Sequence, residues 1–389
     1  MTHTMSYPTL RPRLWLAALG LIAPLCATQA GEPFVAAAAA APEQSIYDQL
    51  WALPVLYNNE DNPVVQQFAL KGRAQFDWFR FENEDADDSD WIVRRIRLGA
   101  QLKFLRDLTL HGEVDLDLQD PDPAYNKLTD AYLKWAVAKE FNVVVGKHGA
   151  KFTLDGSTSS TQLITIDRSN IANNFWFPEE YIPGISFNGE VGNWFYNVGY
   201  FSSGGASPEF GEFNAGSFGL ASLGYNLSEA LGVDKALVRA DYVYQNEDPG
   251  NTFTRSLEQV GSLNFQIEQG RWGFATDVVA AQGYGKQPDL YGMEAMPSYY
   301  FLPGLQAVLR YTYIHSDGNN GIRLARYENR LVSGRGDEYQ EIYAGLNWYL
   351  YGHKAKIQAG IQYTTLDDAA GDGGDYEGWG VTTGLRLSW

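Results

Sequence analysis

From about Val64 to the last residue, apolar and polar side chains alternate along the chain in one run after another. In one early run, Ile96 and Leu98 have one parity, while Arg95 and Arg97 have the other. Because successive side chains of a strand point to opposite faces, each run predicts a β-strand with one apolar and one polar face. About sixteen such runs are present, an even number, as single-chain bacterial barrels require.

The links between these runs alternate between short and long. Arg106-Asp107 and Gln269-Gly270 are short, whereas Phe81 to Asp90 and Ala150 to Pro183 are long. Among the links at the short positions, only Ser228 to Lys235 is longer than a tight turn. Transmembrane barrels have short periplasmic turns and longer outer loops, which a soluble β-sandwich does not. We therefore predict an all-β fold, a transmembrane antiparallel β-barrel of about 16 strands over residues 64–389.

The two ends of the chain carry signals of export. Residues 1–30 combine two arginines, a short apolar run and small residues, as a secretory signal peptide does, and we expect cleavage after Ala30. The tract Ala36 to Ala41 offers an alternative cleavage site. Residues 31–63 would form a periplasmic or lumenal segment, in which residues 44–62 either form a short helix or enter the lumen. The last run, Val381 to Trp389, ends on an aromatic residue, like the terminal strand signal of outer-membrane barrels.

Composition excludes several kinds of function. The formal net charge of −18 becomes −20 when the two arginines of the signal are removed, which argues against nucleic acid as a partner. The one cysteine, Cys26, lies in the signal, so no disulfide or thiolate metal site is expected. We find no zinc spacing, nucleotide fingerprint or hydrolase motif, and expect neither a cofactor nor an enzyme. The acidic segment Glu82 to Asp90 lacks the glycine and closing glutamate of an EF-hand, so we interpret it as a solvated loop.

Several short motifs occur in a characteristic order: Arg94 to Gly99 (RRIRLG), Asp130 to Leu133 (DAYL), Val145 to Lys147 (VGK), Lys151-Phe152 and Gly345 to Leu350 (GLNWYL). In order and spacing they resemble the phosphate-selective porin O and P family, over most of the chain from about residue 64. The resemblance implies a homotrimer of sixteen-stranded barrels in the bacterial outer membrane. It also implies a long third loop, here Ala150 to Pro183, that folds inward and narrows the pore.

The same resemblance implies basic side chains that draw anions through the pore. Arginine is suited to this task because its guanidinium offers directed donors to phosphate, and several weak sites in a row let an ion enter and leave. Motif positions place three arginines on the wall and two basic residues on or beside the third loop, and a further arginine lies on the polar face of the first strand. The predicted anion contacts are Arg73, Arg94, Arg95, Arg97, Lys151 and Arg168.

Acidic residues on the neighbouring strand leave a second interpretation open. If odd-numbered residues face inward on both strands, Arg97 lies opposite Asp115 or Asp117, and Glu113 joins these two in an acidic counter-wall. We expect a passive channel for small hydrophilic solutes that prefers phosphate or other small anions. The alternatives are a general or weakly cation-preferring porin with a charge-balanced lumen, and a blocked barrel that serves as an adhesin or structural anchor. Expected partners are small anions, outer-membrane lipid and lipopolysaccharide.

Overall fold

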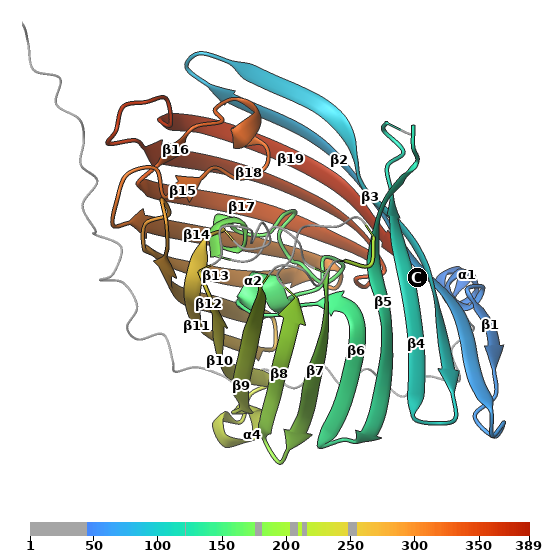
Figure 1. Cartoon of the computed structure of the whole chain (residues 1–389). Coiled ribbons are helices and arrows are strands. Elements are labelled where there is room, and N and C mark those ends of the chain that lie inside the picture. Colours follow the sequence, from blue (N-terminus) through green and yellow to red (C-terminus); the bar gives the residue numbers. More distant parts are fainter. Residues whose placement is uncertain (1–44, 121, 176–180, 203–208, 212–215, 248–254) are drawn as a thin grey trace, which may run out of the picture. The chain divides into compact units, whose positions relative to one another are not determined.

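Sixteen antiparallel strands form the wall of a closed barrel, as predicted. The computed structural model describes residues 45–120, 122–175, 181–202, 209–211, 216–247 and 255–389. Consecutive wall strands pair with one another, and the last strand pairs with the first. The ring closes where the blue strand β2 meets the red strand β19 in Figure 1. The wall strands are β2 (Val65–Asn83), β3 (Asp87–Phe104), β4 (Leu108–Leu116), β5 (Tyr125–Ala138), β6 (Phe141–Gly149), β7 (Tyr181–Val191), β8 (Trp194–Ser202), β9 (Ser217–Asn226), β10 (Lys235–Gln245), β11 (Leu257–Gln269), β12 (Trp272–Gly283), β13 (Leu290–Leu302), β14 (Leu305–Ser316), β17 (Glu338–Tyr351), β18 (Ala355–Asp367) and β19 (Tyr376–Ser388).

The two faces of the wall differ as the alternation predicts. Leu98 on β3 and Ile342 on β17 point outward and are 46% and 60% exposed, whereas Arg97 and Glu341 beside them point inward and are 3% and 2% exposed. An apolar outer surface is stable only against lipid, so the wall has the polarity of a membrane barrel. No helix within the described ranges is long and apolar enough to span a bilayer.

The connections also follow the predicted order, with one correction. Short turns such as residues 139–140 and 270–271 join the strands at one end. The long links whose described parts are residues 150–175 and 317–337 leave the strands at the other end. The prediction of a long first loop from Phe81 to Asp90 is wrong, because β2 and β3 continue to Asn83 and from Asp87. The Asn83 side chain accepts hydrogen bonds from two tip amides, those of Asp85 at 3.1 Å and Ala86 at 2.7 Å, which closes a tight turn.

A short helix and strand precede the wall. Helix α1 (Ile46–Ala52) begins at a capping box formed by Ser45 and Asp48, and β1 (Val55–Asn58) pairs with residues 67–69 of β2. Because β19 pairs with β2 only from Arg73 onward, β1 takes the edge of β2 that β19 leaves uncovered. Of the two possibilities for residues 44–62, the described part forms the helix. The predicted signal peptide, residues 1–30, lies outside the described residues.

Candidate functional site

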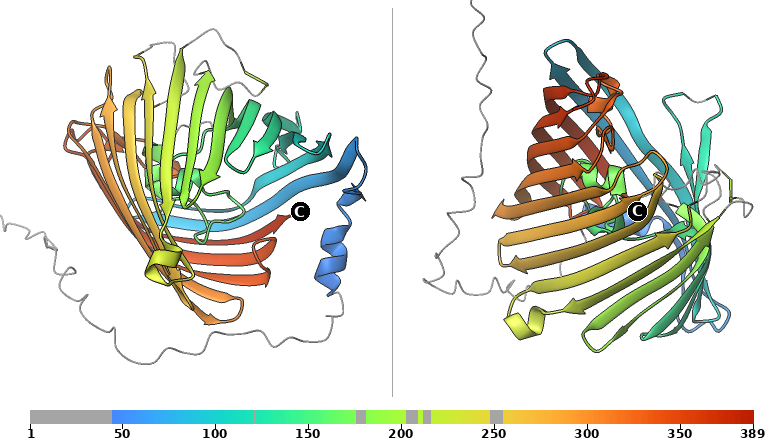
Figure 2. Two further views of the ribbon diagram at one scale, coloured as in Figure 1. Left: turned by 90° about the horizontal axis from the view of Figure 1, so that it is seen from below. Right: turned by 60° about the vertical axis from the view of Figure 1, so that its left-hand side comes forward.

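The described part of the third outer loop, which we call L3 (residues 150–175), lies inside the barrel, as predicted. Figure 2 shows it within the ring of strands, with its short helices α2 (Leu154–Ser157) and α3 (Asn170–Phe175). Two wall carboxylates hold its beginning: Asp241 accepts the amide of Thr153 at 3.0 Å, and Asp277 accepts the amide of Leu154 at 2.7 Å. These bonds satisfy orphan amides at the start of α2.

The middle of L3 is held by donors from the opposite part of the wall. Arg310, Asn347 and Arg386 donate to the backbone carbonyls of Asp167, Ile164 and Ile166 at 2.9, 2.7 and 3.1 Å. Buried backbone carbonyls need such partners, and here the wall supplies them as fixed side chains. L3 is therefore fastened to β10, β12, β14, β17 and β19, and a cavity remains beside β3 to β5.

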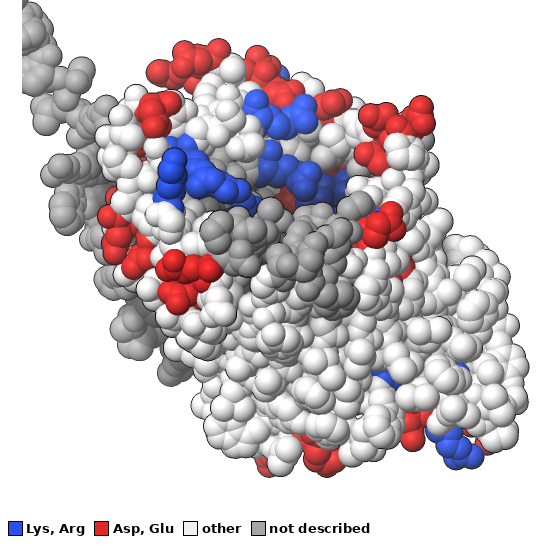
Figure 3. Space-filling view, in the orientation of Figure 1, with Lys and Arg blue, Asp and Glu red and all other residues white. Residues whose placement is uncertain are grey.

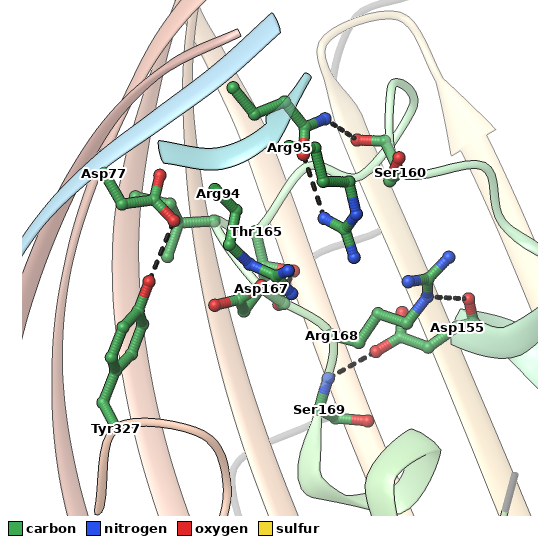
Figure 4. Close-up of polar contacts among 12 residues, drawn as sticks. Asp77, Arg94, Arg95, Asp155, Ser160, Thr165, Asp167, Arg168, Ser169 and Tyr327 are labelled. Atoms are coloured by element: carbon green, nitrogen blue, oxygen red, sulfur yellow. Dashed lines mark hydrogen bonds and ion pairs between the residues drawn. The ribbon is translucent and has the colours of Figure 1, made fainter. Parts of the chain in front are cut away.

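Arg94 and Arg95 both face the lumen because β3 has a bulge between them. The register passes from Gln75 opposite Arg95 to Phe76 opposite Val93, so Arg94 is an extra residue. A bulge reverses the parity of a strand, which re-aims a side chain that strict alternation would turn outward. Figure 4 shows the Arg94 side chain beside Asp167 of L3, with Nη2 3.2 Å from Oδ1.

Arg73 and Arg97 meet the predicted acidic counter-wall. Arg97 lies opposite Asp115, and its guanidinium is 3.5 Å from Asp115 and 3.6 Å from Glu113. Glu113 also pairs with Arg73 at 3.2 Å. Arg97 Nη1 donates to the Tyr181 hydroxyl at 2.6 Å. At these two arginines, the geometry is that of the charge-balanced alternative.

The remaining predicted contacts have different surroundings. Lys151 is exposed at the start of L3. Arg168 braces the loop, since it donates to the carbonyls of Asp155 at 2.9 Å and Thr158 at 3.0 Å. Asp117 accepts the amides of two residues of the following loop and also lines the cavity beside β3 to β5.

The seventh outer loop, L7 (residues 317–337), supplies arginines that our sequence analysis missed. Its chain is held inside the barrel mouth by Tyr327, whose hydroxyl donates to Asp77 at 2.9 Å and whose ring stacks on Phe79 at 4.5 Å. It is also held to L3, because Asn174 accepts the Arg323 amide at 2.9 Å. The sequence feature that could have indicated them is the concentration of four arginines within residues 323–335. L7 also contains β15 (Ile322–Arg323), β16 (Arg335–Gly336) and the 3₁₀ turn Glu328–Arg330.

L3, L7 and the wall enclose a space that we call the arginine cavity, of about 440 Å³. Figure 3 shows Lys and Arg side chains gathered in the upper part of this face of the molecule, with acids around them. Seven arginines and three acids line the cavity: Arg94, Arg95, Arg168, Arg255, Arg310, Arg323, Arg326, Asp167, Glu328 and Glu341. A second space, the wall cavity, has about 310 Å³ and shares Arg94, Arg95 and Arg326 with the first; Arg97, Lys127, Asp115 and Asp117 complete its charged lining.

Two loop acids of the arginine cavity differ in charge. Burial opposes ionisation of Asp167, but the neighbouring Arg94 and Arg326 outweigh it and lower the pKa of this carboxyl to about 2. Burial raises the pKa of Glu328 to about 7, and nearby Glu341 adds to the effect. Glu328 therefore carries only part of a negative charge at neutral pH, and the cavity lining is net positive.

The described residues contain no cluster of three or more His, Cys, Asp or Glu side chains that could hold a metal ion. The arginines that line the two cavities can act on solutes through their charge. Guanidinium groups on a narrow polar path bind and release small charged solutes.

Comparison with solved structures places the fold among outer-membrane porins. The outer membrane channel DcaP of Acinetobacter baumannii is 14% identical, with 86% of this chain and 100% of that one covered and a TM-score of 0.55. OprB of Pseudomonas putida is 11% identical, with 83% of this chain and 94% of that one covered and a TM-score of 0.60. An anion-selective porin from Comamonas acidovorans is 10% identical, with 83% of this chain and 99% of that one covered and a TM-score of 0.57. At these identities the likeness concerns the fold alone.

Comparison of sequences gives the family. No curated protein matches the chain. The family model for phosphate-selective porin O and P matches residues 68–289, from β2 to the link before β13. The chain therefore belongs to the phosphate-selective porin O and P family and is a channel-forming barrel of the bacterial outer membrane.

Proposed function

We propose that this barrel is a passive diffusion channel for small hydrophilic solutes and that it prefers anions, phosphate among them. One observation carries the proposal: seven arginines and only three acids line the arginine cavity. Guanidinium groups replace the water that an oxyanion loses with directed, charge-assisted hydrogen bonds. In a narrow lumen these charges are screened less than in bulk water.

The wall cavity supports the same preference. Arg97 is offset by Asp115 and Glu113, but Arg326 makes no ion pair with any residue that the structure describes. Arg94 pairs with Asp167, and this one carboxylate is the nearest negative charge for both Arg94 and the unpaired Arg326, whose charges together lower its pKa. The excess positive charge therefore comes from the bulge of β3 and from L7, and not from the ion-paired arginines. The known anion-selective porin of similar fold adds weaker support.

The predicted anion contacts enter this proposal with different weights. Arg94 and Arg95 line both cavities and Arg168 lines the larger, so we propose these three as contacts. We retain Arg73, Arg97 and Lys151 as contacts of passing ions, with Glu113, Asp115 and Asp117 as the acidic wall. The channel needs no catalysis. From the family we propose a homotrimer, and from the apolar outer wall a contact with outer-membrane lipid and lipopolysaccharide.

Conductance of the purified protein in a planar bilayer tests the proposal. We expect discrete conductance steps, a reversal potential in a potassium chloride gradient on the anion side, and a decrease of chloride current when phosphate is added. A reversal potential on the cation side would favour the charge-balanced porin. A barrel that inserts but shows no steps would favour the blocked adhesin or anchor.

A further inference from the structure

One carboxyl group of the wall is buried beneath L3 with both of its oxygens unpaired. Glu294 lies on the inward face of β13 and is fully buried. Neither of its carboxyl oxygens has a hydrogen-bond partner within the part of the chain that the structure describes. The Ser169 hydroxyl of L3 faces Glu294 but stays beyond hydrogen-bond distance, and it has no partner either. A carboxylate that loses its water without gaining donors is costly, so these surroundings favour the neutral acid.

L3 keeps the surroundings of Glu294 dry. Gly292 and Met296 flank Glu294 on the same face of β13. The ring of Phe175 covers Gly292, where an added Cβ would lie 2.9 Å from the ring. Met296 packs in one buried cluster with Leu154, at the start of the loop. Glu294 therefore lies between two apolar contacts of L3 with the wall.

Two other carboxyl groups lie close to Glu294. Asp277 of β12 is directly opposite it and accepts two hydrogen bonds, from the Leu154 amide at 2.7 Å and from a serine hydroxyl of β11 at 2.6 Å. Asp155 of L3 is also a neighbour, and it accepts the amide of Ser169 at 2.5 Å. We call Glu294, Asp277 and Asp155 the acid latch. Hydrogen-bond donors favour the charged form of a carboxyl group, so among these three the proton belongs on Glu294.

The strand on the other side of Glu294 supplies no charge to balance it. Arg310 of β14 is the neighbouring cation, but its guanidinium donates to Glu341 at 2.9 and 3.2 Å. Thr312 of β14 is directly opposite Glu294, yet its hydroxyl also donates to Glu341, at 3.3 Å. The polar side chains of β14 thus serve Glu341 and leave Glu294 without a counter-charge.

We propose that Glu294 stays a neutral carboxylic acid in the folded barrel, and that loss of its proton at alkaline pH releases the start of L3 into the lumen and closes the channel. An ionised Glu294 would repel Asp277 and Asp155, the two acids that hold the amides of residues 154 and 169. L3 would then move away from this wall, toward the open side of the lumen beside β3 to β5. Ser169 lines the arginine cavity, which gives the proton a route to the lumen.

The pH dependence of unfolding tests the neutral state. An unfolded glutamate loses its proton above about pH 4.3, whereas Glu294 would keep its proton in the folded barrel, so unfolding would release a proton. Stability is then present at low pH and is lost as pH rises. From about pH 5 upward, the folding equilibrium constant should fall about tenfold more per pH unit in the wild type than in Glu294→Gln. Urea unfolding of the full barrel in lipid vesicles at several pH values measures both slopes.

Glu268→Gln is the matched control for this measurement. Glu268 is an exposed glutamate of β11 that pairs with Lys235, so its replacement should keep the wild-type slope. Asp277→Asn is an independent second variant, because it keeps an acceptor for the Leu154 amide and removes the charge opposite Glu294. The pH at which the slope levels off should move down by about one unit or more in this variant. Equal slopes in the wild type and Glu294→Gln would overturn the neutral state, as would an unchanged levelling pH in Asp277→Asn.

Single-channel recordings in a planar bilayer at pH 7 and pH 10 test the control of L3. The wild type should close more often at pH 10, and Glu294→Gln should lose this alkaline increase, whereas Glu268→Gln should retain it. Glu328 titrates at about pH 7 and is present in all three barrels, so its effect cancels in the comparison. If Glu294→Gln closes at pH 10 as often as the wild type does, Glu294 does not hold L3.

The outcome is distinguishable from that of the proposed function, because Glu294 lines neither cavity. If the reversal potential lies on the cation side while Glu294→Gln still loses the alkaline closures, the anion preference fails and the acid latch stands. If the pore prefers anions and Glu294→Gln behaves like the wild type at every pH, the acid latch fails alone.

Discussion

Arg97 lies directly opposite Asp115 across the β3–β4 pair, with its Nε 3.5 Å from Asp115 Oδ1. The pair shows how the wall combines a basic row with acids that neutralise part of it. A buried ion pair whose partner is removed leaves an uncompensated charge, and in a pore that charge acts on the permeating ions.

Asp115→Asn should therefore increase anion preference. Arg97 would keep Glu113 as a partner, but this carboxylate already serves Arg73. We expect the ratio of chloride to potassium permeability, from reversal potentials, to rise about two- to fivefold, the effect of one unit charge at short range under partial screening. Asp87→Asn, at an exposed rim acid, should change the ratio little. An unchanged ratio in Asp115→Asn would show that ions do not pass this wall.

Arg95→Glu tests the positive charge that the bulge of β3 supplies. Arg95 has a neutral partner, Gln75 at 2.9 Å, and lines both cavities, so the change replaces a lumen cation with an anion. We expect the reversal potential to move toward the cation side and current block by phosphate to weaken about tenfold or more. Arg330→Glu, outside both cavity linings, is the charge-matched control. If both variants shift the reversal potential equally, long-range charge and not this site sets the preference.

The pH dependence of selectivity follows from Glu328. Its pKa of about 7 lies above that of an ordinary glutamate, so the group is protonated in the folded barrel as pH falls through about 7. The arginine cavity then loses a negative charge, and anion preference should rise between pH 8 and pH 6. Asp167 stays ionised over this range because its pKa is about 2, and no histidine lines either cavity among the described residues.

Reversal potentials at several pH values check this expectation. Glu328→Gln should hold the high anion preference at every pH, since it removes the titrating group and keeps a hydrogen-bonding side chain beside Gln362 and Thr364. A wild-type preference that falls with decreasing pH would contradict the assignment, as would a Glu328→Gln barrel that keeps the full pH response.

The fold could be predicted because each strand of a membrane barrel has one face toward lipid and one face toward the polar lumen. Leu98 and Arg97 differ in exposure for that reason alone, and the same period-two pattern locates the strands all around the wall. Parity also placed Arg97 opposite Asp115 or Asp117, and the strand register shows that the partner is Asp115. These features depend on local sequence, which alternation reports directly.

The candidate site could be predicted only in part, because its remaining features depend on contacts distant in sequence. The adjacent arginines Arg94 and Arg95 break the alternation, yet only the pairing with β2 shows that a bulge turns both inward. The entry of L7 into the barrel depends on Tyr327 reaching Asp77, 250 residues away. The first loop was predicted too long because its acids look like a solvated segment, although β2 and β3 continue through them.

The last prediction concerns the seam where the barrel closes. Trp51 of α1 donates its indole N–H to the carbonyl of Ser388 at the end of β19, and its ring lies 5.1 Å from that of Tyr351. Tyr47 stacks on the same ring at 5.5 Å, and the Tyr351 hydroxyl donates to Asp48 at 2.6 Å. The helix thus joins the end of β19 to the turn after β17, beside the edge of β2 that β1 covers.

Trp51→Phe and Trp51→Ala separate the two parts of this contact. The phenylalanine variant loses the hydrogen bond and keeps an aromatic ring, so it should lower the free energy of unfolding by about 1 kcal/mol. The alanine variant also loses the ring contacts and should cost about 1–3 kcal/mol in total. Urea unfolding of the barrel in lipid vesicles measures both, and Leu53→Ala, at a side chain that is 70% exposed, is the control. A segment that bridges β19 and β17 must resist the opening of the seam between β19 and β2. If Trp51→Ala unfolds at the same urea concentration as the wild type, α1 does not stabilise this seam.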